Sequence, residues 1–95
     1  MRTIYKYPLS IIKIQDVEMK KPAKILHIGF DPNHKLCIWA YVNTEEFLCT
    51  VRFVIIGTGD PARATDFGEV LPQDYLTSVM DGKSVWHIFR PQSTF

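Results

Sequence analysis

The sequence has few of the features that mark membrane, secreted or nucleic-acid-binding proteins. No apolar run approaches the roughly 18 residues of a membrane span, and no charged and then apolar N-terminus suggests a signal peptide. Eleven Lys and Arg residues against ten Asp and Glu give a net charge of +1, and the basic cluster is only Lys20-Lys21 with Lys24. Because duplex binders carry a concentrated basic stripe, we expect no DNA or RNA polymer and no membrane as partner.

Cysteine is scarce as well. The two cysteines, Cys37 and Cys49, both lie in apolar runs. If residues 35–42 pair with 48–56 as a hairpin, the resulting register holds the two thiols too far apart for a disulfide. We therefore predict buried, reduced thiols, which are typical of a cytosolic protein.

Patterns for catalysis or metal binding are also missing. His27, His34 and His87 are far apart in sequence, and none has a Cys, Asp or Glu at metal-ligand spacing. Neither cysteine has the base and the electropositive surroundings that activate a nucleophile. We expect no metal, no cofactor and no catalytic residue, so the protein is predicted not to be an enzyme.

What the sequence does contain is a series of alternating or apolar segments separated by Gly, Pro, Asn and Asp, which is typical of β-strands. Expected strands cover residues 4–9, 11–19, 23–30, 35–42, 48–56, 75–80 and 83–90. Asp81-Gly82 predicts a two-residue hairpin turn, and Asp60-Pro61 permits at most one short helical turn near 61–66. We predict a single all-β domain over residues 1–95, a small antiparallel β-sandwich or open barrel of six or seven strands.

Several of these strands are apolar on both faces, as in residues 36–42 and 51–56. An antiparallel sheet with one solvated face should alternate instead, and no helix is expected to cover the second face. Residues 62–73 or the N-terminal strands could cover it. The other solution is a second copy of the chain, and we expect a homo-oligomer.

A glycine-rich turn after a buried strand is the first candidate binding element: Gly57, Thr58, Gly59 and Asp60. Glycine permits close approach, so backbone N–H groups in such a turn can face an anion. Arg63 follows closely and its guanidinium suits phosphate. The turn matches neither the Walker loop nor the dinucleotide fingerprint, and an ordinary strand-ending loop is the alternative interpretation.

The closing hairpin is the second candidate. With the two-residue turn given above, Trp86 lies opposite Thr77 and shares a face with Tyr75, so the two rings could stack on a base. In the same register His87 lies opposite Leu76. Core packing is the alternative for Trp86, whereas an imidazole on an apolar face needs a hydrogen-bond partner.

Five short motifs resemble a family of small proteins encoded by bacteriophages and prophages. They are Ile4 to Leu9 (IYKYPL), Ala23 to Ile28 (AKILHI), Leu36 to Ala40 (LCIWA), Gly57 to Gly59 (GTG) and Val85 to Phe89 (VWHIF). The family loop usually continues with histidine where this chain has Asp60. The resemblance implies a phage accessory protein in the cytoplasm of the bacterial host, and it transfers no catalytic residues.

Phage proteins of this kind resemble counter-defence proteins as a class. The hypothesis is a protein that binds and sequesters a small phosphorylated nucleotide, an immune signal, without catalysis. Its expected site residues are Gly57, Thr58, Gly59, Asp60, Arg63, Tyr75, Trp86 and His87. The alternative is an inhibitor that binds a host defence protein through an exposed apolar face or an open sheet edge, with Trp39, Tyr41 and Phe47 as anchors.

Overall fold

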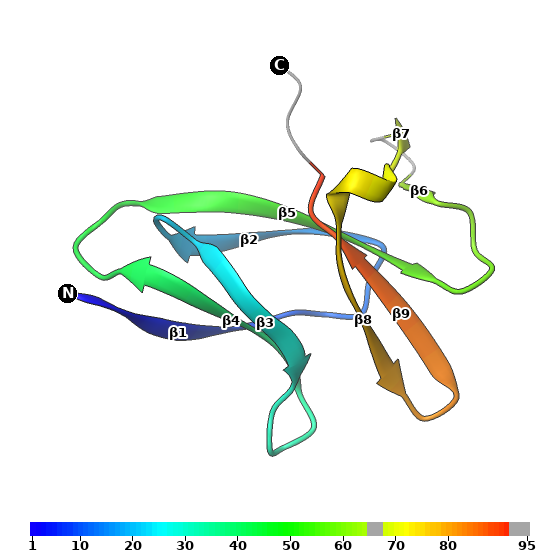
Figure 1. The fold of residues 1–95 in the computed structure, drawn as a ribbon, viewed down its shortest axis with the longest axis horizontal. Helices are drawn as coiled ribbons and strands as arrows, with labels where there is room; N and C mark the ends of the chain where they lie inside the picture. The colour runs from blue at the N-terminus through cyan, green and yellow to red at the C-terminus, as the bar shows by residue number, and fades with distance from the viewer. Residues whose placement is uncertain (65–67, 92–95) are drawn as a thin grey trace. The chain divides into compact units, whose positions relative to one another are not determined.

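The computed structural model describes residues 1–64 and 68–91 of the chain. Its elements, in chain order (Figure 1), are β1 (Arg2–Pro8), β2 (Ile14–Lys20), β3 (Lys24–Phe30), β4 (Leu36–Asn43), β5 (Leu48–Gly57), β6 (Arg63–Ala64), β7 (Gly68–Glu69), the 3₁₀ helix η1 (Pro72–Asp74), β8 (Tyr75–Asp81) and β9 (Ser84–Phe89). The predicted all-β fold with seven main strands is confirmed. The strands β6 and β7 form an additional short pair.

The seven main strands lie in two sheets. One sheet has the order β1-β4-β3, and the other has the order β2-β5-β9-β8. The chain also divides into two compact units, Met1–Ile11 with Asp16–Val51 and Ile12–Gln15 with Arg52–Phe95. Because their residues fall on both sides of this division, β2 and β5 each contribute to both units.

The helical turn within the described residues is η1, and it lies after the segment where one was expected. Pro72 occupies its first turn, where a fixed φ favours helix entry, and the Asp74 carboxylate accepts the Leu71 N–H at 3.3 Å. Residues 63 and 64 of the expected turn belong to strand β6 instead. Residues 65 and 66 lie outside the described part of the chain.

In the first unit, β4 is central because its residues are apolar in nearly every position. Ile38, Ala40 and Val42 have no exposed surface. Strands β1 and β3 pair antiparallel with the two edges of β4. A sheet with this order leaves the outer edges of β1 and β3 open within the first unit.

The hairpin expected between residues 35–42 and 48–56 is wrong. Both edges of β4 are taken by β1 and β3, and β5 lies between β2 and β9. The register that argued against a disulfide is therefore absent, although both thiols are free as predicted. Cys37 and Cys49 are both free, with Cys37 buried and Cys49 half-buried.

In the second unit, the end of β5 is buried on both faces. Val54 and Ile56 form an apolar cluster with Val70, and Ile14 and Phe89 pack against it. The alternate residues of β5 point to the opposite face and are also buried in the single chain. This burial removes one of the grounds on which self-association was expected.

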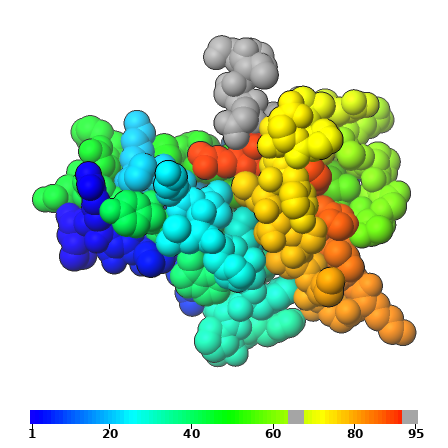
Figure 2. All heavy atoms as spheres, viewed as in Figure 1, coloured from blue at the N-terminus to red at the C-terminus, as the bar shows by residue number. Residues whose placement is uncertain are grey.

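The closing hairpin turns one residue later than its Asp-Gly sequence predicts. Asp81 lies opposite Ser84, so Gly82 and Lys83 form the turn. Gly82 has a φ of +61°, which glycine adopts without the steric cost that other residues pay. The turn, coloured orange, projects at the surface of the molecule (Figure 2).

The later turn changes the register of the whole hairpin. Trp86 lies opposite Val79 rather than Thr77, and His87 lies opposite Ser78. The expected pairings of both residues are therefore wrong. The actual register places the Ser78 hydroxyl opposite the imidazole, which gives the ring the hydrogen-bond partner that a polar group on an apolar strand needs.

Candidate functional site

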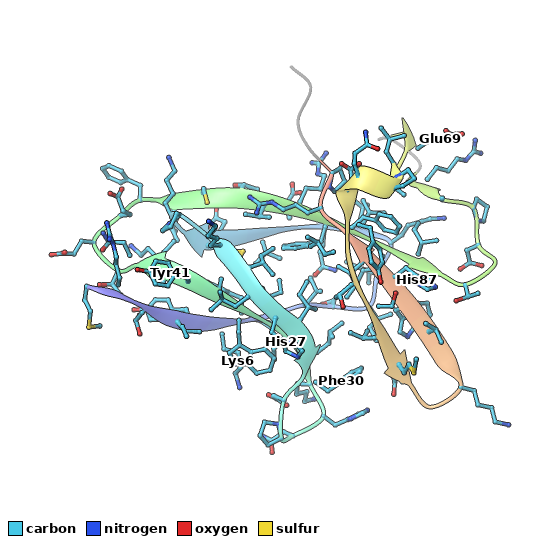
Figure 3. The ribbon with its side chains drawn as sticks, in the orientation of Figure 1. Lys6, His27, Phe30, Tyr41, Glu69 and His87 are labelled. Atoms are coloured by element: carbon cyan, nitrogen blue, oxygen red, sulfur yellow. The ribbon has the colours of Figure 1, made fainter. Side chains whose placement is uncertain are left out.

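Four hydrogen-bonded polar side chains form a row in the second unit, with His87 of β9 at its centre (Figure 3). The His87 Nε2 atom is 2.6 Å from Thr58 Oγ1, and its Nδ1 atom is 2.7 Å from Ser78 Oγ. Ser78 Oγ is in turn 2.7 Å from the Tyr75 hydroxyl. His87 and Ser78 are half-buried, whereas Thr58 and Tyr75 are exposed. These four residues are called the His87 row below.

Sheet geometry explains most of the row. His87 pairs with Ile56 on β5 and with Ser78 on β8. Thr58 follows Ile56 by two positions, and residues two apart in an extended chain share a face. The Thr58 N–H donates to the Val85 carbonyl at 3.3 Å, which keeps the chain extended beyond the end of β5.

An apolar cavity of about 380 Å³ adjoins the Tyr75 end of the row. It is lined by Ala62, Val70, Pro72, Tyr75 and Phe89. A register shift in β8 brings Tyr75 opposite Phe89, and their rings meet edge to face with centroids 5.7 Å apart. Tyr75 thus belongs both to the cavity wall and to the row of hydrogen bonds.

The glycine-rich turn offers fewer amides to a ligand than its sequence suggested. The Thr58 amide is already bonded to the Val85 carbonyl, and the Asp60 N–H donates to the Gly57 carbonyl at 3.0 Å. Gly59 has a φ of +91°, which explains the glycine at this position. What the turn contributes to the row is the Thr58 hydroxyl.

The expected platform of Trp86 and Tyr75 is not formed. Trp86 is adjacent to His87 on β9, so it points to the opposite face of the strand, and it pairs with Gly57. A Cβ atom on Gly57 would lie 3.2 Å from the Trp86 ring and 2.9 Å from Asp60 Oδ2. The Trp86 Nε1 atom is buried and makes no hydrogen bond within the described chain.

The structure divides the eight predicted site residues into groups. Thr58, Tyr75 and His87 belong to the row. Gly57, Asp60 and Trp86 are close together on the other face of the strands. Gly59 forms the turn, and Arg63 lies on β6, outside both groups. Arg63 is exposed on β6, opposite Glu69, and follows Ala62 of the cavity wall.

The sequence reasoning missed Ser78 of the row and, apart from Tyr75, the residues of the cavity wall, which are Ala62, Val70, Pro72 and Phe89. A hairpin turn placed one residue later would have put Ser78 opposite His87. The signal was available, because a histidine on an apolar strand needs a partner and Ser78 is a polar side chain that shares a strand face with Leu76, the residue predicted opposite His87.

The row can adopt two hydrogen-bond directions, because a neutral imidazole donates through one nitrogen and accepts at the other. In the first, Thr58 donates to Nε2, Nδ1–H donates to Ser78 and Ser78 donates to Tyr75. The Tyr75 hydrogen is then free to donate outward. In the second, every bond is reversed, and the Tyr75 oxygen is free to accept. The row can therefore match a ligand that offers either an acceptor or a donor at the cavity.

The clearest electrostatic perturbations lie in the first unit. Asp31 accepts backbone N–H groups of Lys35 at 2.8 Å and Asn33 at 2.9 Å, and its Oδ2 lies 3.1 Å from Lys6 Nζ. The Lys35 N–H, with the Lys6 and Asn33 donors, lowers the pKa of the Asp31 carboxyl. Burial, followed by the nearby Asp31 charge, raises the pKa of the Cys37 thiol.

Within residues 1–64 and 68–91, no three His, Cys, Asp or Glu side chains are grouped so that they could hold a metal ion. No helix in these ranges has the length and apolar character needed to cross a membrane.

Comparison with known proteins adds one match. The model of a family described as "Domain of unknown function (DUF7352)" matches residues 1–94. No curated protein and no solved structure matches the chain.

Proposed function

The chain belongs to the DUF7352 family, and we propose that it binds a small phosphorylated nucleotide at the His87 row and the adjoining cavity without altering it. The observation that carries the proposal is the Tyr75 side chain. It forms part of an apolar cavity wall and ends a row of polar groups that is hydrogen-bonded through His87. An apolar pocket with a few convergent polar groups is the usual form of a small-molecule site.

A nucleobase suits the cavity in size and chemistry. The volume of about 380 Å³ lies within the range of about 300–1,000 Å³ typical of ligand pockets. Tyr75 and Phe89 supply aromatic surface on which a planar ring can pack. Bases carry both donors and acceptors on their edges, and the reversible direction of the row accommodates either kind of group at Tyr75.

Arg63 supplies the contact to phosphate in this proposal. It is exposed, and it follows Ala62 of the cavity wall directly in the chain. A guanidinium can bind phosphate oxygens with two parallel hydrogen bonds. This assignment replaces the earlier expectation of a phosphate held by the amides of the glycine-rich turn, because the Thr58 and Asp60 amides are bonded within the chain.

The surroundings of the imidazole support the part of the proposal that concerns binding without turnover. Both of its nitrogens are hydrogen-bonded to hydroxyl groups, whereas a catalytic triad orients the histidine through a carboxylate. An oxyanion also needs preorganised donors, and two amides of the nearby turn are already used. In the phage setting that the motif resemblance implies, this binding would sequester an immune signal inside the host cell.

Native mass spectrometry with a pool of cyclic di- and trinucleotides and ADP-ribose-like compounds tests the proposal. We expect a stoichiometric adduct whose ligand is released with unchanged mass. Ser78→Ala should weaken binding about tenfold, since it interrupts the row and leaves the Nδ1 atom of His87 without its partner. Ser84→Ala makes the same change at an exposed position on the same hairpin and should leave binding unchanged.

Two outcomes would reject the nucleotide site. One is the absence of any adduct and of any thermal shift across the pool. The other is an equal loss of binding in both serine variants while both remain folded. Either outcome would favour the second candidate, an inhibitor of a host defence protein, for which Phe47 is a suitable anchor because 82% of its surface is exposed.

A further inference from the structure

We infer that a second pocket, within the first unit, binds a small phosphate monoester that carries a flat ring. The pocket has a volume of about 360 Å³. It is lined by two cations, an aromatic ring, a proline, an amide and a carboxylate, which are Arg2, Lys21, Tyr41, Pro22, Asn43 and Glu46. None of these residues belongs to the His87 row, and the inference does not depend on the nucleotide proposal.

The walls of this pocket are tied together by backbone hydrogen bonds. The Lys21 N–H donates to the Phe47 carbonyl at 3.2 Å, and the Asn43 N–H donates to the Lys21 carbonyl at 2.7 Å. The Glu46 N–H donates to the Asn43 carbonyl at 3.1 Å. These bonds join the turn before β3 to the turn after β4, so the pocket is formed before a ligand arrives. A preformed site avoids part of the entropic cost of binding.

The charges at this pocket favour an anion. Arg2 and Lys21 are exposed cations, and across residues 1–64 and 68–91 neither side chain forms an ion pair or a hydrogen bond. Lys24 adds a third positive charge on the neighbouring strand, where it lies opposite Tyr41. Glu46 contributes the carboxylate of the lining. Positive charge thus exceeds negative charge around the pocket.

The two cations that line the pocket suit the charge of a phosphate monoester better than the charge of a carboxylate. A phosphate monoester carries about 1.5 to 2 negative charges near neutral pH, whereas a carboxylate carries one. The guanidinium of Arg2 can bind two phosphate oxygens at once, and Lys21 can approach a third as a point charge. Two cations that have no protein partner therefore match the phosphate dianion.

The apolar part of the lining suits a flat ring beside the phosphate. Tyr41 is 36% exposed, and Figure 3 shows it on β4 in the first unit. Ile4 lies opposite Tyr41 on β1 and is 55% exposed, and Pro22 stands at the pocket wall. Aromatic and proline surfaces can pack against a planar group.

Titration of ¹⁵N-labelled protein with phenyl phosphate, followed by amide chemical shifts, tests this site. We expect saturable shifts at the pocket residues, with phenol binding much more weakly. Arg2→Gln and Lys21→Gln should each weaken binding about three- to tenfold, because each removes one exposed charge pair. Glu46→Gln should strengthen binding by a few fold. Lys83→Gln, at an exposed position in the β8–β9 turn, should change nothing.

The lack of an effect at Lys83 separates a defined site from general electrostatic attraction, because general attraction would weaken on loss of any exposed positive charge. Equal weakening by Lys83→Gln, or phenol binding as tightly as phenyl phosphate, would overturn the inference. So would the absence of saturable binding. If Tyr75→Ala abolished the shifts and Arg2→Gln did not, the probe would occupy the cavity of the His87 row, which would support the proposed function and reject this second site.

Discussion

Asp31 shows how one side chain can organise a turn. Its Oδ1 atom accepts the N–H groups of Asn33 and Lys35, so a single carboxylate closes the connection between β3 and β4. Its Oδ2 atom pairs with Lys6 of β1 at 3.1 Å. The same residue therefore links the turn to strand β1. The hydrogen bonds from these donors lower the pKa of the Asp31 carboxyl.

Acidification should destabilise the protein in part through Asp31. A carboxyl whose pKa is lowered by folding contributes stability that is present above its unfolded pKa of about 3.9, and that is lost as the pH falls through this value towards the folded pKa. We expect Asp31→Asn to lower the urea midpoint at neutral pH and to flatten its decline below about pH 5. Urea unfolding at a series of pH values measures both effects.

Glu69→Gln is the control for this series, because it removes an exposed carboxylate on β7. It should keep the wild-type pH dependence. If Asp31→Asn declined as steeply as the wild type, the carboxylate would not be the source of the stabilisation.

At the scale of elements, the end of β5 shows why glycine precedes Thr58. Gly57 is buried, and it lies under the Trp86 ring and beside the Asp60 carboxylate. Its partner on β9 is Trp86 itself. A side chain at this position would have to push the ring away from the strand, so the small residue lets β5 and β9 stay paired up to the start of the turn.

Gly57→Ala should destabilise the protein by about 1–3 kcal/mol, since overpacking a filled site forces side chains to move. The Asp60 carboxylate ends an exposed side chain and can move aside, whereas the Trp86 ring is half-buried. We therefore expect Asp60→Ala to restore only a minor part of the loss when it is combined with Gly57→Ala. Thermal unfolding of the two single variants and the double variant measures these terms. Full recovery in the double variant would show that the carboxylate, and not the ring, limits the site.

At the scale of the whole molecule, the division into two compact units bears on the expectation of a single domain. Strands β2 and β5 contribute residues to both units, so unfolding one unit removes part of the strands of the other. Each unit also contains one tryptophan, Trp39 in the first and Trp86 in the second. These two residues provide a separate optical probe for each unit.

Unfolding should be cooperative over both units. We expect the variants Trp39→Phe and Trp86→Phe, each of which keeps one tryptophan, to give fluorescence midpoints in urea that coincide with the midpoint from circular dichroism of the same variant. Coincidence is the standard test of two-state behaviour. A fluorescence midpoint that differs from the circular dichroism midpoint in either variant would show that the units unfold separately, and that the chain holds two domains.

Self-association stays a prediction, but its grounds have changed. Both faces at the end of β5 are buried within one chain, so these faces no longer require a second copy. Apolar side chains that remain exposed include Phe47 at 82%, Met80 at 74% and Leu48 at 54%. A mass near a multiple of the 11.0 kDa of one chain, seen in the native spectra recorded without nucleotide, would identify an oligomer.

The sequence by itself determined the strands and the kind of turns between them. Period-two patterns and apolar runs located the seven main strands, because side chains on a pleated chain alternate between faces whatever the strand pairs with. Turn residues marked the ends of those strands, because Gly, Pro, Asn and Asp tolerate turn geometry locally. The need of His87 for a partner was predictable on the same local grounds.

Only the tertiary structure decided which strands are neighbours and in what register. The apolar pattern of β4 is equally compatible with pairing to β5, to β1 or to β3, and the choice depends on how all strands bury their surfaces together. A turn placed one residue later moved Ser78 opposite His87, and the register shift between Tyr75 and Thr77 put Trp86 and Tyr75 on different faces. Register is a non-local property, and the His87 row, which depends on two strand pairings and a turn, could be completed only once the chain had folded.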